Sequence, residues 1–174
     1  MLTPTPLPGI ALAALLLVPV LTLSSATVLA HGERAHGDKR ASGAALDMMD
    51  TAFGRTGDPK RVTRTVEIRM GDDMRFVPDR IEVRRGETLR LRIANRGRLM
   101  HELVIGTDQE LAQHAALMRK NPDMEHDAPF MAHVAPAKRG EIVWQFTRPG
   151  QFSFACLVPG HFEAGMRGTI VVKE

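Results

Sequence analysis

Cysteine, tyrosine and tryptophan are scarce in this chain of 174 residues, which has one Cys, one Trp and no Tyr. A single cysteine excludes an intramolecular disulfide framework, an iron–sulfur cluster held by cysteines alone and a Cys-rich zinc module. The apolar share of 44% and the charged share of 25% are close to those of soluble proteins. These values exclude a mostly disordered chain and a multi-span membrane protein, and we expect one folded domain.

Charge is also missing from the start of the chain, because residues 1–30 contain no Asp, Glu, Lys, Arg or His. The apolar run from Ile10 to Leu23 is short for a membrane span, and Val28-Leu29-Ala30 supplies a small-residue cleavage pattern. We therefore predict a signal peptide over residues 1–30 and a periplasmic mature protein. An uncleaved anchor is the alternative, because positive residues are missing from the start. The absence of a twin-arginine pair favours export as an unfolded chain.

The next segment, residues 31–60, is rich in Gly, Asp, Ala and Arg without sustained periodicity and predicts a flexible arm. From residue 61 to residue 174, apolar and polar residues alternate in short runs, as in Leu89-Arg-Leu-Arg-Ile93. Seven or eight such strands, separated by turns such as Pro149-Gly150, predict an all-β fold, a Greek-key sandwich.

One segment of the predicted domain does not alternate. Residues 108–120 place Leu111, Ala115 and Met118 on one helical face, with Asp108 as the capping residue and Asn121-Pro122 as a stop. This helix opens a polar insertion that we expect to last to about residue 139. Long insertions of this kind are usually functional or mobile.

The basic residues are concentrated in the segment from residue 60 to residue 98, which has 12 basic and 6 acidic side chains. Acids alternate with the basic residues and Phe76 is the one aromatic residue among them, so the pattern indicates a polarised surface rather than a nucleic-acid groove. An acidic protein partner could use this surface, and we expect no nucleic-acid partner and no membrane insertion after signal cleavage.

Four potential metal ligands lie at or near the ends of predicted strands. Cys156, His161 and Met166 are spaced five residues apart, and Cys156 shares a strand face with Phe152 and Phe154. His101 shares an inward face with apolar neighbours on an earlier strand. Two imidazoles, a thiolate and a weak thioether are the donors of a mononuclear electron-transfer copper site.

Other kinds of site fit these residues less well. Zinc is the main rival on ligand chemistry alone. A multicopper enzyme would need several further His pairs, a dinuclear copper centre would need a second cysteine, and a cysteine hydrolase would need an exposed reactive thiol. A buried cysteine can also be an inert core residue. The combination of all four residues predicts a copper-binding protein that is not an enzyme.

Three blocks of the chain resemble the cupredoxins, the family of small blue and green copper proteins. They are FVPDRIEVRRGETLRLRIAN from Phe76, MHELVI from Met100 and FACLVPGHFEAGM from Phe154. The resemblance implies a Greek-key β-sandwich with one type 1 copper held by His101, Cys156, His161 and Met166. The spacing of the ligand loop is similar to that of rusticyanin. Glu102 departs from the family pattern, in which many members have Asn or Ser beside the first ligand.

The arm and the insertion resemble those of the CopI-type periplasmic cupredoxins associated with copper tolerance. That resemblance implies that these two segments bind additional copper ions through histidine imidazoles and methionine thioethers. The residues concerned are His31, His36, His114, Met118, Met124, His126, Met131 and His133. Methionine also fills gaps in cores, so these residues need no copper to explain them. The predicted function is copper tolerance, and the alternative is a soluble electron carrier that docks transiently with redox partners near His161 and Phe162.

Overall fold

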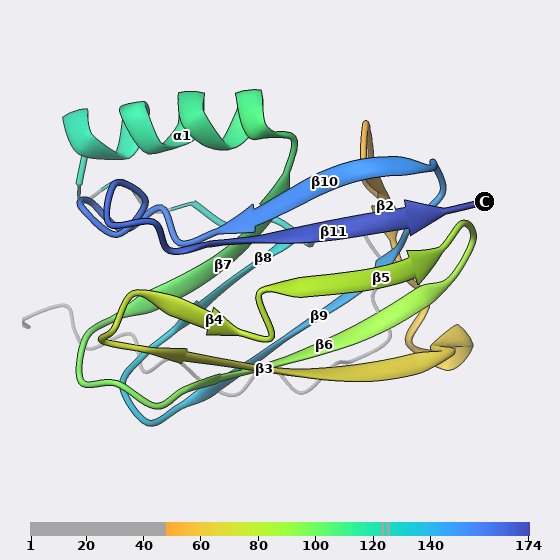
Figure 1. The fold of residues 1–174 in the computed structure, drawn as a ribbon, viewed down its shortest axis with the longest axis horizontal. Helices are drawn as coiled ribbons and strands as arrows, with labels where there is room; N and C mark the ends of the chain where they lie inside the picture. The colour runs from red at the N-terminus through yellow and green to blue at the C-terminus, as the bar shows by residue number, and fades with distance from the viewer. Residues whose placement is uncertain (1–47, 123, 125) are drawn as a thin grey trace, which may run out of the picture. The chain divides into compact units, whose positions relative to one another are not determined.

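The computed structural model describes residues 48–122, 124 and 126–174, which form a β-sandwich with one helix on the outer face of one sheet (Figure 1). One sheet has six strands in the order β1-β2-β9-β6-β3-β4, and the other has five in the order β5-β11-β10-β7-β8. The expected all-β sandwich is therefore confirmed. Within the described residues, no helix combines the length and the apolar character needed to cross a membrane.

The elements of the first sheet are β1 (Asp50–Thr51), β2 (Gly54–Thr56), β3 (Arg64–Gly71), β4 (Arg75–Val77), β6 (Thr88–Asn95) and β9 (Arg139–Gln145). Those of the second sheet are β5 (Arg80–Arg84), β7 (His101–Gly106), β8 (Met131–Val134), β10 (Gly150–Ala155) and β11 (Arg167–Lys173). A short 3-10 turn, η1, covers Pro59–Arg61, and the helix α1 covers Asp108–Lys120.

The core lies between the sheets and is built from the apolar positions that alternate in the sequence. On β6, Leu89, Leu91 and Ile93 are fully buried, and they are separated by the two arginines at 90 and 92, which reach the surface. On β9 and β10, Trp144 and Phe154 are equally buried. Period-two alternation identified these strands because neighbouring side chains of a strand point to opposite faces of its sheet.

The packed domain begins earlier than residue 61, so the expectation of a flexible arm is wrong for residues 50–60. Strand β2 pairs with β9, opposite Gln145 and Trp144, and Phe53 is only 2% exposed. The ring of Phe53 packs 5.4 Å from that of Trp144, centroid to centroid. Strands β1 and β2 are two and three residues long, which is too short to show a period of two in the sequence. Residues 31–47 of the expected arm, and the predicted signal peptide, lie outside the described residues.

The helix α1 confirms the expected residues 108–120, but its N-cap is Thr107 rather than Asp108. The Thr107 hydroxyl accepts a hydrogen bond from the Glu110 N–H, and the Glu110 carboxylate accepts one from the Thr107 N–H. This reciprocal capping box satisfies two amide groups that the first turn leaves free. The apolar face of α1 packs on the outer side of β7 and β10, against Val104 and Ala155.

The segment after α1 is not a polar insertion as far as residue 139. Strand β8 pairs with β7, with His101 opposite Val134 and Val104 opposite Met131, so the second half of the expected insertion is the edge of the sheet. A run of four residues with burial at its two ends gives no alternating signal. Only residues 107–130 separate the paired strands β7 and β8, and α1 fills more than half of that stretch.

Candidate metal centre

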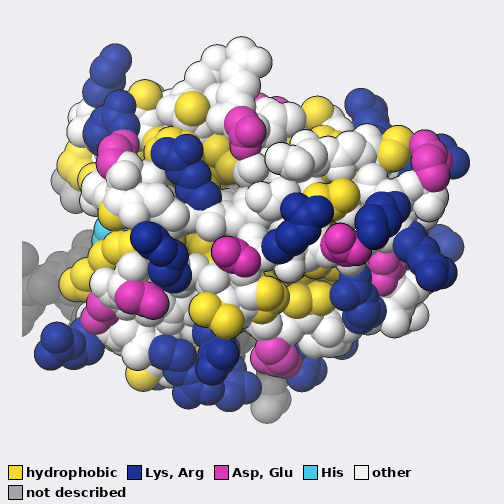
Figure 2. Space-filling model, viewed as in Figure 1, with side chains coloured by type: hydrophobic (Ala, Val, Ile, Leu, Met, Phe, Trp, Pro, Cys, Tyr) yellow, Lys and Arg dark blue, Asp and Glu magenta, His cyan; other side chains and the backbone are white. Residues whose placement is uncertain are grey.

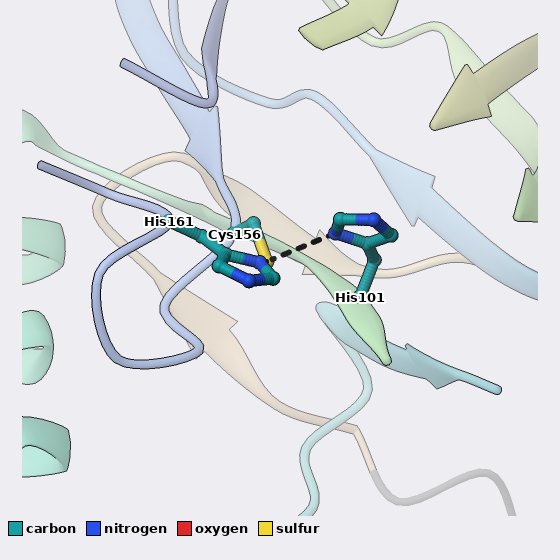
Figure 3. A group of neighbouring side chains, drawn as sticks. All are labelled: His101, Cys156 and His161. Atoms are coloured by element: carbon teal, nitrogen blue, oxygen red, sulfur yellow. Dashed lines mark hydrogen bonds between the residues drawn. The ribbon is translucent and has the colours of Figure 1, made fainter. Parts of the chain in front are cut away.

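His101, Cys156 and His161 converge at one end of the second sheet (Figure 3). The Cys156 Sγ atom lies 3.3 Å from His161 Nδ1 and 4.0 Å from His101 Nδ1, and the potential ligand atoms all lie within 4.8 Å of one another. His101 and Cys156 are fully buried, whereas His161 is half-buried. Because β10 pairs with β7, the first residue of β7 and the residue after β10 are brought to the same end of the sheet.

Met166 is the last residue of the loop that joins β10 to β11 and contains Cys156 and His161. It is fully buried in the core cluster that contains Cys156. Its carbonyl accepts a hydrogen bond of 3.1 Å from the Cys156 N–H, and its N–H donates one of 3.1 Å to the His161 carbonyl. The antiparallel pairing of β10 with β11 holds both ends of the loop, since Ala155 lies opposite Arg167. The loop can therefore present several side chains in one fixed arrangement.

The ring of His101 is oriented by Asp72, a residue that the sequence analysis did not identify. The Asp72 Oδ1 atom lies 3.3 Å from His101 Nε2, and a carboxylate can only accept, so Nε2 donates. The Asp72 carboxylate also accepts from the backbone N–H groups of Arg98 and Leu99, and the first of these contacts is the main cause of its lowered pKa. In this tautomer the Nδ1 lone pair is directed toward Cys156, as a metal ligand requires.

Glu102 is almost fully buried and contacts the ligand loop twice. Its Oε1 atom accepts a 2.8 Å hydrogen bond from the Leu157 N–H, and its own backbone N–H donates to Cys156 Sγ at 3.4 Å. Its Oε2 atom lies 3.0 Å from His133 Nδ1. A glutamate between the predicted ligand His101 and the apolar residues Leu103 to Ile105 was the sequence signal for this role, because a buried carboxylate requires partners.

Burial changes the protonation of the cluster. It raises the pKa of Cys156 from 9.0 to about 12, and it is the main cause of the lowered pKa of His161, to which the charge of His101 adds. At neutral pH the imidazole of His161 is held neutral and the thiol keeps its proton until a metal displaces it. Two imidazole nitrogens and a soft sulfur in an apolar site suit copper in both oxidation states. The residues therefore fit the predicted metal.

The other predicted copper residues divide into three groups. His114, His126 and His133 lie together: the ring centroids of His114 and His126 are 4.6 Å apart, and those of His126 and His133 are 5.1 Å apart. Met118 and Met131 are buried in the apolar cluster under α1, where packing accounts for them, and Met124 lies half-buried against that cluster. His31 and His36 lie outside the described residues.

Comparison with known proteins agrees with this geometry. Residues 62–173, which include all four predicted ligands, match the model of the copper binding proteins of the plastocyanin/azurin family. The copper-resistant cuproprotein CopI of Rubrivivax gelatinosus is 50% identical over 90% of this chain and 94% of its own length. The protein of the same name from Pseudomonas aeruginosa is 32% identical over 76% of this chain and 89% of its own.

A solved structure of auracyanin B has the same fold, with a TM-score of 0.59 and 22% identity over 72% of this chain and all of that one. The sequence match and the fold thus agree on one family, and its cofactor is copper. The chain belongs to the plastocyanin/azurin family of copper-binding proteins and, within it, to the CopI cuproproteins.

Proposed function

We propose that this protein binds one type 1 copper through His101, Cys156, His161 and Met166 and serves copper tolerance in the periplasm. The observation that carries the ligand assignment is the convergence of two imidazole Nδ1 atoms on one buried thiol. The similarity to the copper-resistant CopI proteins supports the role in tolerance. When bound, copper supplies a one-electron couple between its cuprous and cupric states.

The surrounding residues hold the site in one arrangement. Asp72 fixes the tautomer of His101, and Glu102 fixes the backbone of Leu157, the residue after the cysteine. Leu157 and Met166 are almost completely buried, so water is kept from the Cys156 side of the site. A rigid site lets copper change oxidation state without large movements of its ligands. Because copper must displace the Cys156 proton, its affinity should fall in acid.

A titration of the copper-free protein with Cu(II) tests the ligand assignment. We expect a strong thiolate-to-copper band in the visible spectrum that saturates at one copper per chain and is absent from Cys156→Ser. The matched control is Gln151→Ala, an exposed position on β10 that should leave the band unchanged. If Cys156→Ser keeps the band, or if the wild-type protein never shows one, the assignment is wrong.

The role in tolerance is tested in the host. Deletion of the gene should make cells more sensitive to copper salts, wild-type protein should restore growth and Cys156→Ser should not. The point variant is preferable to removal of residues 108–139, because that deletion would also remove β8 from the sheet. Unchanged copper sensitivity after deletion would contradict the proposed role.

A second candidate function is electron transfer to a redox partner. His161 and Phe162 are both half-buried at the surface of the ligand loop, and the Arg167 guanidinium lies 3.7 Å from the Phe162 ring centroid. Figure 2 shows that Lys and Arg side chains are spread over the face of β4, β5 and β11 with acids between them, which could steer an acidic partner. If electron transfer is the function, Phe162→Glu should slow oxidation by a partner while leaving the visible spectrum intact.

We further propose that residues 1–30 direct export and are removed. The similarity to the CopI proteins along 90% of the chain supports an exported protein. Mass spectrometry of the protein from a periplasmic extract should find His31 as the first residue. Recovery of the full chain from the membrane fraction would instead favour the uncleaved anchor.

A further inference from the structure

A second group of potential ligands lies beside the copper site and is not part of it. Glu102, His126 and His133 each offer one ligand atom, and these atoms all lie within 4.8 Å of one another. The three residues come from β7, from the segment after α1 and from β8, so only the folded sheet brings them together. Ligands of a tetrahedral site with metal bonds of 2.0–2.1 Å are separated by about 3.3 Å, which small movements of these side chains would reach.

The hydrogen bonding of His126 is that expected of a metal-binding histidine, with one ring nitrogen held by the backbone and the other unpartnered among the described residues. Its Nδ1 atom lies 3.0 Å from the Met124 carbonyl, which can only accept, so Nδ1 carries the hydrogen and Nε2 carries the lone pair. Nε2 is buried and has no hydrogen-bond partner among the described residues. A buried polar atom without a partner destabilises the fold, so it indicates a missing contact.

His133 lies on the opposite side of the group and also has one ring nitrogen tied to the backbone. Its Nε2 atom lies 3.0 Å from the His126 carbonyl and must donate to it, while its Nδ1 atom lies 3.0 Å from Glu102 Oε2, which can only accept. Without a metal, Nδ1 therefore donates to that carboxylate, and a bound metal would take the place of its proton. Metal-bound histidines commonly donate their second ring nitrogen to a backbone carbonyl, which fixes the ring and the tautomer. Both imidazoles therefore have one nitrogen tied to the backbone and the other directed into the group.

We propose that His126 Nε2, His133 Nδ1 and Glu102 Oε2 form a second metal site that binds Cu(II) in the cell and Zn(II) in its absence. Two imidazoles and a carboxylate are borderline and hard donors that suit these divalent ions, and they contain no sulfur that would favour Cu(I). Cu(II) binds such donors more strongly than Zn(II) does. Three protein ligands leave one coordination position open. The His114 ring, on α1, lies beside His126, with the two ring centroids 4.6 Å apart.

The second site is joined to the copper loop through a single residue. The carboxylate that would bind the second metal through Oε2 holds the Leu157 N–H through Oε1, and the backbone N–H of the same Glu102 donates to Cys156 Sγ. A metal at Oε2 would draw charge from the carboxylate and weaken its hold on the loop. Occupancy of the second site should therefore shift the absorption of copper at the first. This coupling rests on the proposed type 1 site, whereas the second site itself does not.

The site is tested first without copper, by counting the Zn(II) bound to the mature protein in competition with a chromophoric chelator. We expect the double variant His126→Gln with His133→Gln to bind one Zn(II) fewer than the wild-type protein. The control Gln113→Ala changes an exposed residue beside His114 and should bind as many as the wild type. Because the result is the difference between the wild-type protein and the variant, zinc bound elsewhere on the chain contributes equally to both and cancels. If the double variant binds as many as the wild type, the site is refuted.

The single variant His133→Gln covers the case in which the double variant does not fold. The His133 side chain is 40% exposed, so the change leaves the core intact, and it should also remove the extra Zn(II). Retention of that ion by a folded His133→Gln protein would equally refute the site.

The coupling is tested on protein that carries one Cu(II) per chain. Addition of Zn(II) should shift the thiolate band of the wild-type protein and leave that of the double variant unchanged. A wild-type band that does not move while the zinc count falls in the variant overturns the coupling and keeps the site. If no thiolate band forms at all, the proposed function fails, but the zinc count still decides the second site.

Discussion

Glu102 supports the backbone of the ligand loop, and two substitutions of similar volume separate its hydrogen bond from its packing. Glu102→Gln keeps an oxygen that can accept from the Leu157 N–H, whereas Glu102→Leu fills the same space without an acceptor. Glu102 and Leu157 are both buried, with 1% exposure each, so water cannot replace the hydrogen bond that Glu102→Leu removes. The contact itself is short, at 2.8 Å. The difference between the two variants therefore measures the cost of leaving one buried N–H unpaired.

That cost is about 1–3 kcal/mol for a buried donor without a partner. His133 contributes little to the difference, because it is exposed and water can hydrate its ring in either variant. We expect Glu102→Gln to lie within about 1 kcal/mol of the wild-type protein, and Glu102→Leu to be less stable than Glu102→Gln by about 1–3 kcal/mol. Because Leu157 follows Cys156, the leucine variant should also shift the thiolate band of the copper-loaded protein more than the glutamine variant does.

The free energies of unfolding are measured on copper-free protein by urea denaturation. Trp144 is the only tryptophan and is fully buried, so its fluorescence reports the unfolding of the sandwich. Equal stability of the two variants, within about 0.5 kcal/mol, would refute the reasoning, as would a leucine variant more stable than the glutamine variant. Either result would mean that the carboxylate is not needed to hold the loop.

Three further changes test other parts of the structure. In copper-free protein at pH 8, the Cys156 thiol should react with an alkylating agent about 1,000-fold more slowly than in the urea-unfolded chain. The reason is that burial raises its pKa from 9.0 to about 12, and each unit lowers the thiolate fraction tenfold. Equal rates in the folded and unfolded chains would contradict this. Gly168→Ala would place a Cβ atom against the Phe154 ring and should destabilise by about 1–3 kcal/mol in thermal melts, and an unchanged melting temperature would show that the ring can move. Thr107→Ala should cost about 0.5–2 kcal/mol in urea melts, because the Glu110 N–H loses its cap; Thr107→Ser, which keeps the hydroxyl, should lose much less.

The fold class and the four predicted copper ligands followed from local patterns in the sequence. Strand parity put Cys156 on the face of Phe152 and Phe154, and all three are buried. This inference needs only neighbouring residues, because side chains alternate between the two faces of any strand. The helix over Asp108–Lys120 was predicted for a similar reason, since Leu111, Ala115 and Met118 repeat at helical spacing and lie on its buried face.

The partners of these residues were decided by the tertiary structure. Asp72 and His101 are 29 positions apart, and Glu102 and Leu157 are 55 apart, so no local pattern links them. Phe53 joined the core through Trp144, 91 positions away, which is why the start of the domain was placed too late. The sequence alone determined which side chains face inward and which donors the chain can offer a metal. Only the pairing of β7 with β8 and β10 determined which of those donors meet, because strand pairing joins residues that are distant in the chain.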